Sequence, residues 1–103
     1  MAKVRITVVK KLNHKSLYGD NPPATFTASP ECDILEVGQE FIVEDPRKCP
    51  RGFCGWAFAD IHRDITLFSY GCSYSENIPE GTSLACCTDG YRPVIFKLER
   101  IED

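Results

Sequence analysis

Six cysteines are the residues of this 103-residue chain with the most versatile chemistry. A thiolate is a nucleophile and a ligand for zinc or iron, whereas a buried thiol acts as a small apolar side chain. No two of them have the C-x-x-C spacing that is typical of zinc ribbons, so spacing alone does not define a metal site. The six are Cys32, Cys49, Cys54, Cys72, Cys86 and Cys87.

Cys54 is the candidate for a reactive thiol, because a helix is predicted to begin beside it. The free N–H groups and the positive dipole end at a helix N-terminus stabilise an anion, which makes a thiolate there a better ligand or nucleophile. The alternative is that Cys54 only begins the apolar stripe of this helix and packs in the core. If the protein is an enzyme, we expect Cys54 to be its catalytic residue.

Cys86 and Cys87 stand where a predicted strand enters a turn. Neighbouring side chains of a strand point to opposite faces, so both thiols can serve one site only if the chain leaves strand geometry there. Together with Cys32 and Cys54 they form a predicted four-sulfur set for a zinc or iron ion. The alternative chelating pair is Cys49 and Cys54, but its spacing is a weaker metal signal than C-x-x-C.

Four other side chains are candidates for binding a ligand beside these thiols. Trp56 can be a core residue or the aromatic wall of a pocket. Asp60 shares a helical face with Asp64, an arrangement that is typical of exposed ion pairs and less often serves acid–base chemistry. Asp89 and Arg92 can shape a turn, or Arg92 can present its guanidinium group to an anionic ligand.

The strands that would position these residues are predicted from the alternation of apolar and polar side chains. The first strand covers 3–11, and a second, short strand ends the stretch 32–44. A closing hairpin over 82–101 turns at Asp89 and Gly90, a pair that is a strong hairpin signal because glycine tolerates a positive φ.

One helix is predicted over 53–71, since apolar residues recur three and four positions apart and Gly71 suits its C-terminal end. Its apolar face consists of Cys54, Ala57 or Phe58, Ile61, Ile65, Phe68 and Cys72, and a mostly polar stripe consists of Trp56, Asp60, Arg63 and Asp64. The stretch 13–31 shows no period and is predicted to be a long surface loop. The order of elements predicts an α+β fold: a small antiparallel or mixed sheet with one main helix packed on it, in a single domain over 1–103.

Composition limits the partners of the chain. A formal net charge of -3 argues against nucleic-acid binding, which needs a basic surface. No secretory signal and no stretch long enough to cross a bilayer is apparent, so we expect a cytoplasmic protein with reduced thiols and no membrane partner. The basic first strand and the largely acidic tail 99–103 are predicted to be neighbours in the sheet.

Three stretches, EVGQEFIVE, GFCGWAFADIHRD and ACCTDGYRPVIFKLERIE, resemble an uncharacterised family of small bacterial and archaeal proteins, of about a hundred residues, that is defined by a sequence profile. The resemblance is close from Cys32 onward and loose in the first strand, and it implies no particular activity. It implies that Cys49 and Cys72 are local variations, and so favours the four-sulfur set. The residues of this chain that match the family pattern are Cys32, Cys54, Trp56, Asp60, Cys86, Cys87, Asp89 and Arg92.

Three functions follow as expectations. The first is a binding module whose thiol-lined site, between the helix start and the closing hairpin, holds a zinc or iron ion or a small ligand. The second is a structural or interaction domain, such as a homodimer, in which the cysteines only pack. The third is a thiol-based redox enzyme that uses Cys54, with Cys86 or Cys87 as the resolving partner.

Overall fold

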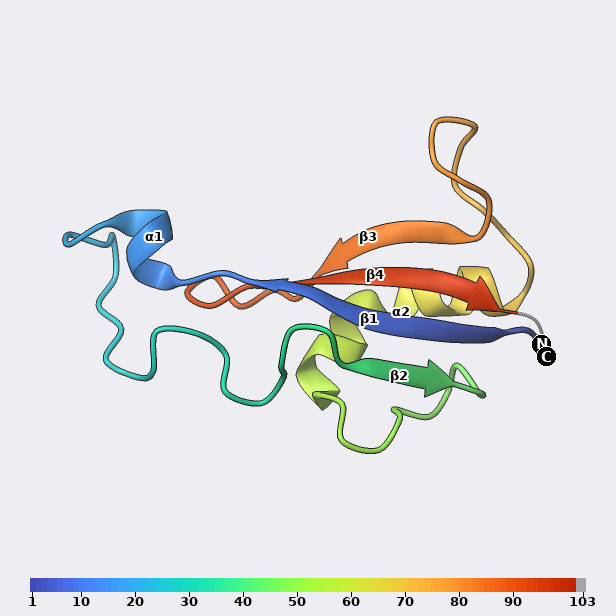
Figure 1. Ribbon diagram of the computed structural model, residues 1–103, viewed down its shortest axis with the longest axis horizontal. Coiled ribbons are helices and arrows are strands. Elements are labelled where there is room, and N and C mark those ends of the chain that lie inside the picture. The colour runs from blue at the N-terminus through green and yellow to red at the C-terminus, as the bar shows by residue number, and fades with distance from the viewer. Residues whose placement is uncertain (102–103) are drawn as a thin grey trace.

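The computed structural model describes residues 1–101 (Figure 1), and Glu102 and Asp103, the end of the predicted acidic tail, lie outside the described residues. The elements are β1 (Lys3–Lys11), α1 (His14–Tyr18), β2 (Glu40–Val43), α2 (Gly55–Ser69), β3 (Thr82–Cys86) and β4 (Val94–Ile101). The four strands form one sheet in the order β2-β1-β4-β3, and α2 lies across one of its faces (Figure 1). The predicted α+β fold is confirmed, and each strand pairing is antiparallel.

β1 and β4 are the two central strands, although they come from opposite ends of the sequence. Ile6 lies opposite Leu98 in their ladder, and both side chains are buried. On the other face Arg5 lies opposite Glu99, and its Nε donates to the Glu99 carboxylate at 3.3 Å. The prediction that the basic first strand and the C-terminal strand are neighbours is therefore confirmed.

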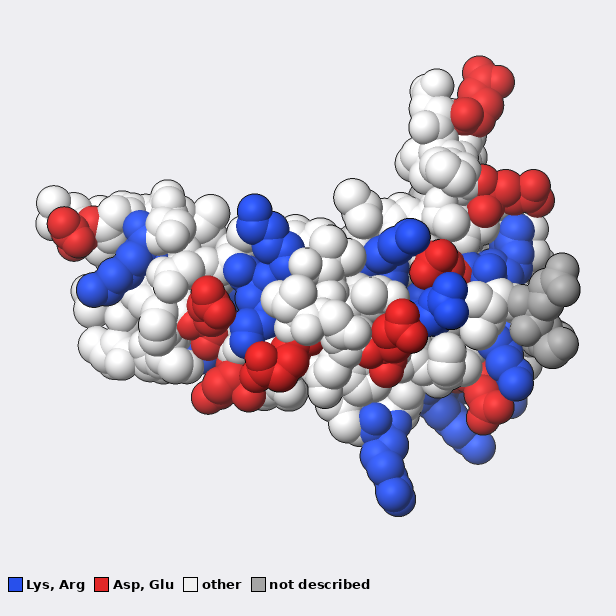
Figure 2. Space-filling model, viewed as in Figure 1, with Lys and Arg blue, Asp and Glu red and all other residues white. Residues whose placement is uncertain are grey.

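The sheet face that is turned away from α2 carries charged side chains of both signs. Figure 2 shows basic and acidic groups next to one another over this face. Glu99 lies between two cations there, because Lys97 Nζ is 3.4 Å from its second carboxylate oxygen. Such pairing balances charge locally across neighbouring strands.

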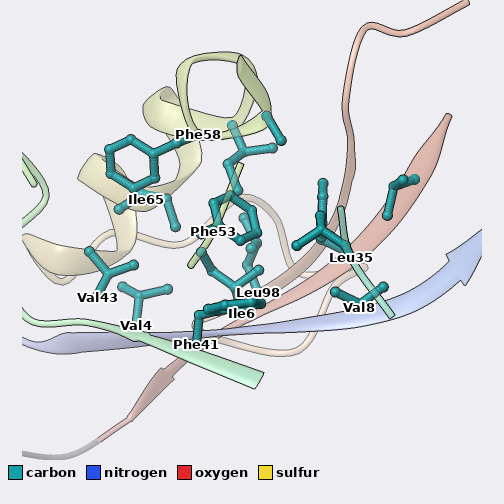
Figure 3. Close-up of a cluster of buried hydrophobic side chains, with 14 of the residues drawn as sticks. Val4, Ile6, Val8, Leu35, Phe41, Val43, Phe53, Phe58, Ile65 and Leu98 are labelled. Atoms are coloured by element: carbon teal, nitrogen blue, oxygen red, sulfur yellow. The ribbon is translucent and has the colours of Figure 1, made fainter. Parts of the chain in front are cut away.

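The core lies between α2 and the sheet (Figure 3). α2 contributes the side chains of Ala57, Phe58, Ile61, Ile65 and Phe68, all of them buried, as the spacing of apolar residues predicts. No helix within residues 1–101 combines the length and the hydropathy that a membrane span needs.

Two residues of the predicted helix stripes lie elsewhere. Cys72, predicted on the apolar face, is exposed, because α2 ends at Ser69 and the chain turns away. Asp64, predicted on the polar stripe, is buried, because its carboxylate accepts a hydrogen bond from the hydroxyl of Tyr74. The polar partner in the loop after α2 compensates for the loss of water around this carboxylate.

The C-terminal end of α2 is a Schellman motif. Gly71 has a φ of 85°, its N–H donates to Phe68 O at 3.1 Å, and the N–H of Cys72 donates to Leu67 O at 2.9 Å. These bonds satisfy carbonyls that the helix leaves without a partner, and the left-handed conformation suits glycine. The prediction of Gly71 as the stop is confirmed.

The stretch 13–31, predicted to be a loop, contains the short helix α1. Asn13 caps it, since its Oδ1 accepts from the N–H of Lys15 at 2.8 Å, and Gly19 ends it with a φ of 71°. A helix of 5 residues is too short to show an apolar period, and His14 is its only buried side chain. The Tyr18 hydroxyl donates to Gly90 O at 2.6 Å, which ties α1 to the turn between β3 and β4.

That turn is shaped by Asp89 and not by its glycine. Asp89 Oδ1 accepts from the N–H of Tyr91 at 2.9 Å and from the N–H of Arg92 at 3.0 Å. Gly90 is not among the glycines with positive φ. The expectation that Gly90 supplies a positive φ is wrong, whereas the prediction that Asp89 shapes the turn is confirmed.

Candidate functional site

A pocket with a volume of about 350 Å³ lies at the N-terminal end of α2, beside the turn that joins β3 to β4. Its walls come from three parts of the chain: the segment before β2, the first turn of α2, and the closing hairpin. These parts meet because β4, which belongs to the closing hairpin, lies at the centre of the sheet, and because α2 crosses one face of that sheet. Three of the thiols face this cavity, namely those of Cys32, Cys54 and Cys87.

The fourth sulfur of the predicted set lies elsewhere. Cys86 is the last residue of β3, is exposed, and does not line the pocket. Strand alternation explains this, since Cys87 and Cys86 must point to opposite faces. Although the residue is exposed, partial burial of its sulfur, with the neighbouring Cys87 and Asp60, raises the pKa of the Cys86 thiol.

The two cysteines outside the predicted four-sulfur set also lie away from the pocket. Cys72 is exposed after α2, and Cys49 is exposed in the loop before α2. The Cys49 thiol donates weakly to Phe53 O, at 3.8 Å, and burial raises its pKa. Neither the arrangement nor the pKa direction marks Cys49 as a reactive thiolate.

Cys54 stands at the start of α2, as predicted, while the reactivity of its thiol stays a prediction. It is the N-cap of α2, where its Sγ accepts from the N–H of Ala57 at 3.5 Å, and it also packs against the core. Cys87 has a parallel role in the hairpin, because its Sγ accepts from the N–H of Val94 at 3.3 Å. Both sulfurs are thus held in place by backbone donors, with their remaining surface toward the pocket.

These thiols are not arranged as the ligand set of one metal ion. Within residues 1–101, no group of three or more His, Cys, Asp or Glu side chains is placed to hold a metal. The predicted zinc or iron site therefore stays a prediction, and no chemistry is derived from it.

Trp56 and Asp60, both predicted to bind a ligand, each form a hydrogen bond with Thr88 in the turn between β3 and β4. The Trp56 Nε1–H donates to Thr88 Oγ1 at 3.2 Å, and the Thr88 N–H donates to Asp60 Oδ2 at 2.8 Å. Trp56 lines the pocket but its side chain is 73% exposed, so it forms an outer wall and is not a core residue. Asp60 does not line the pocket, and its carboxylate instead fastens the turn to α2.

Arg92 is the one cationic side chain among the residues that line this pocket. Its Nη1 donates to Ser29 Oγ at 3.0 Å, and its guanidinium carbon lies 4.9 Å from the centre of the Phe26 ring. Phe26 in turn stacks on Tyr91 with 4.7 Å between ring centres. The guanidinium group is therefore held by Ser29 through a hydrogen bond and by the Phe26 ring over one of its faces.

The charge of Arg92 is only loosely balanced. Its Nε is buried without a hydrogen-bond partner, and the nearest carboxylate oxygen, Asp89 Oδ2, is 3.7 Å away. The other oxygen of Asp89 is already committed to the backbone of the turn. Arg92 thus keeps donor capacity at the pocket.

The sequence did not identify the residues that hold Arg92. Phe26 and Ser29 belong to the stretch 13–31, which has no period that would place them. The single signal was composition, since Phe26 is the only aromatic side chain between Tyr18 and Phe41. Ile34 and Leu35, which also line the pocket, were predicted only as part of the approach to a strand.

Comparison with known proteins gave no match: no family model fits the chain, and no curated protein or solved structure is significantly similar to it. The family resemblance stays a prediction, and function has to be argued from the pocket.

Proposed function

We propose that this protein is a binding module that holds a small organic ligand in the pocket between the start of α2 and the closing hairpin. The observation that carries the proposal is the convergence on one cavity of Cys32, Cys54 and Cys87 with Trp56, Asp89 and Arg92. An apolar cavity with a few convergent polar groups is the usual form of a small-molecule site, and about 350 Å³ lies at the small end of the usual range.

The binding role is favoured over a thiol enzyme by the state of the sulfurs. Cys54 and Cys87 each accept a backbone hydrogen bond, and of the two predicted resolving partners only Cys87 shares the pocket with Cys54, whereas Cys86 faces away from it. All six cysteines are free, which fits the reducing cytoplasm that we infer for the protein. A homodimer and the absence of a nucleic-acid partner remain predictions from composition.

A zinc or iron ion is the second candidate ligand, favoured by the three thiols that share the cavity. Elemental analysis of protein purified without oxygen tests it. We expect less than about one-tenth equivalent of either metal, because the thiols do not form a ligand set. A stoichiometric metal that Cys32→Ser and Cys54→Ser both remove would establish the ion instead.

The binding role can be tested with Trp56, because it is the only tryptophan of the chain. A library of small aromatic and aliphatic compounds is screened by NMR, with the Trp56 indole N–H signal as the reporter of the pocket. Cys32→Phe should fill the cavity and abolish the shifts, whereas Cys72→Phe, an equal change at an exposed site away from the pocket, should preserve them. If no compound shifts the signal, the proposed function is wrong.

A further inference from the structure

Resting on the proposed function, we infer the chemical class of the ligand: a monoanionic organic acid, with its carboxylate at Arg92 and an alkyl or aryl body against the apolar wall. The argument depends on three properties of the pocket: a fixed cation with unused donors, a limited amount of positive charge, and an otherwise apolar lining.

The fixed cation is Arg92. Its side chain is 21% exposed, its Nη1 donates to Ser29 in the segment between α1 and β2, and the Phe26 ring lies against one face of the guanidinium group. A guanidinium group whose geometry is set before binding loses little conformational freedom when an anion arrives. Nε is too buried for a ligand to reach, but within residues 1–101 Nη2 makes no hydrogen bond, so a carboxylate that approaches from the pocket meets a donor that no protein group uses.

The positive potential at this end of the pocket has a second source. The pocket lies at the N-terminus of α2, where Cys54 occupies the cap and its sulfur takes the N–H of Ala57. The positive end of the helix dipole therefore points toward the cavity and favours a negative group. The helix terminus adds to the effect of Arg92 but does not by itself define the site.

The amount of positive charge limits the ligand to a single negative charge. Arg92 is the only cationic residue of the lining, and Asp89 stands 3.7 Å from it. Asp60 lies just behind Thr88 and adds a second carboxylate close to the rim. A phosphate dianion would add two negative charges beside these two carboxylates, whereas a carboxylate adds only one and is therefore the better tolerated anion.

The remaining wall selects an apolar body. Leu35, Ala57, Val94 and Phe96 line the floor, and each of them is buried. The thiols of Cys32, Cys54 and Cys87 extend this surface with weakly polar groups, and Trp56 stands at the outer edge. Apolar surface of this kind stabilises a hydrocarbon ligand through burial.

The test compares phenylbutanoate with its neutral isostere phenylbutanamide, both titrated into the full chain at neutral pH by NMR and calorimetry. We expect the acid to bind at least about tenfold more tightly, which is the gain from one charge-assisted hydrogen bond. The terminal guanidinium N–H signals of Arg92 should shift with the acid and stay in place with the amide.

Arg92→Gln should reduce the preference for the acid over the amide to less than about twofold. Arg51→Gln, an exposed arginine that does not line the pocket, is the matched control and should keep the preference. If Arg92→Gln does not fold, the comparison of the two ligands on the wild-type chain still decides the question.

The outcomes separate the inference from the function on which it rests. If acid and amide bind wild type equally, or if Arg92→Gln keeps the preference, the ligand class is wrong while the binding role stands. If neither compound binds but neutral members of the library do, the ligand class is again wrong. If nothing in the library or the pair binds, both proposals are overturned.

Discussion

The indole N–H of Trp56 donates to the hydroxyl of Thr88 across a distance of 3.2 Å. This bond joins the first turn of α2 to the turn between β3 and β4, two segments more than 30 positions apart in the chain. Thr88 is at the same time held by Asp60 through its N–H and its hydroxyl. The outer wall of the pocket is thereby fixed to the hairpin.

Thr88→Val removes the hydroxyl while keeping the shape of the side chain. We expect a loss of about 1 kcal/mol in the free energy of unfolding, because Trp56 and Asp60 each lose a partner. The Trp56 emission should also change in the folded protein, since its N–H becomes free to bond water. Urea denaturation followed by circular dichroism measures the first effect, and fluorescence of the native state measures the second.

Thr82→Val is the control for this change. The Thr82 hydroxyl makes one exposed hydrogen bond, to Pro79 O at 2.8 Å, and this bond involves neither Trp56 nor the turn beside the pocket. An equal change of Trp56 emission in Thr82→Val would show that the bond to Thr88 is not what holds the indole.

Glu99→Gln tests the ion pairing on the outer face of the sheet. Burial alone would raise the pKa of Glu99, but the hydrogen bonds and charges of Arg5 and Lys97 together outweigh it, so that its pKa is lowered from 4.5. A lowered pKa in the folded state means that the charged form stabilises the fold above the unfolded-state pKa. This contribution is lost as the pH falls below about 4.5 toward the folded-state pKa.

We therefore expect Glu99→Gln to lower the stability at pH 7 by about 0.5 kcal/mol and to flatten the loss of stability under acid conditions. Glu76→Gln, in the exposed loop before β3, should change neither quantity. Denaturant melts at several pH values measure both. A wild-type stability that does not fall between pH 5 and pH 3 relative to Glu99→Gln would contradict the pairing.

Two glycine substitutions compare the end of α2 with the turn between β3 and β4, because the sequence predicts a glycine-dependent conformation at both places. Gly71→Ala forces alanine into a φ of 85° and should cost about 1 kcal/mol, although no atom lies near the new methyl group. Gly90→Ala meets no atom within 4 Å and needs no positive φ, so its effect should be close to zero or slightly stabilising. Thermal unfolding of both variants gives the comparison. Equal losses would mean that the closing turn does depend on glycine.

Alkylation of the six thiols tests which of them face the pocket and whether the pKa of Cys86 is raised. Because partial burial of its sulfur raises the pKa of Cys86, its reaction with iodoacetamide should reach half of its maximal rate at a pH above the usual thiol pKa of about 8.5. A ligand in the pocket should protect Cys32, Cys54 and Cys87 and leave the rate at Cys86 unchanged. Tandem mass spectrometry separates the adjacent sites. Protection of Cys86 together with Cys87 would place both thiols at one site.

The strands and the main helix could be predicted because each buries one face. Val4, Ile6 and Val8 alternate along β1, and Ile61, Ile65 and Phe68 repeat along α2, so that burial leaves its period in the sequence. α1 could not be predicted in this way, since its limits depend on Asn13 and Gly19 and it has no apolar stripe. The burial of Asp64 likewise depends on Tyr74, a partner that no local pattern identifies.

Only those features of the pocket that depend on local backbone geometry could be predicted from the sequence. The alternation of side chains along a strand is enough to separate Cys86 from Cys87. The position of Cys54 at the helix start follows from the period of α2. By contrast, the contact of Arg92 with Phe26 and Ser29 depends on how an aperiodic segment folds back over the hairpin, and this is a tertiary effect.

The pairing of β1 with β4 also has a consequence for synthesis of the protein. Lys3 lies opposite Ile101, so the middle of the sheet cannot close until the ribosome has made and released nearly the whole described chain. Until then β1 lacks its longest partner strand, and its apolar side chains stay accessible to chaperones and to other unfinished chains. Closure of the sheet is therefore expected to wait for the synthesis of β4 and to be slow relative to the folding of helical proteins of the same length.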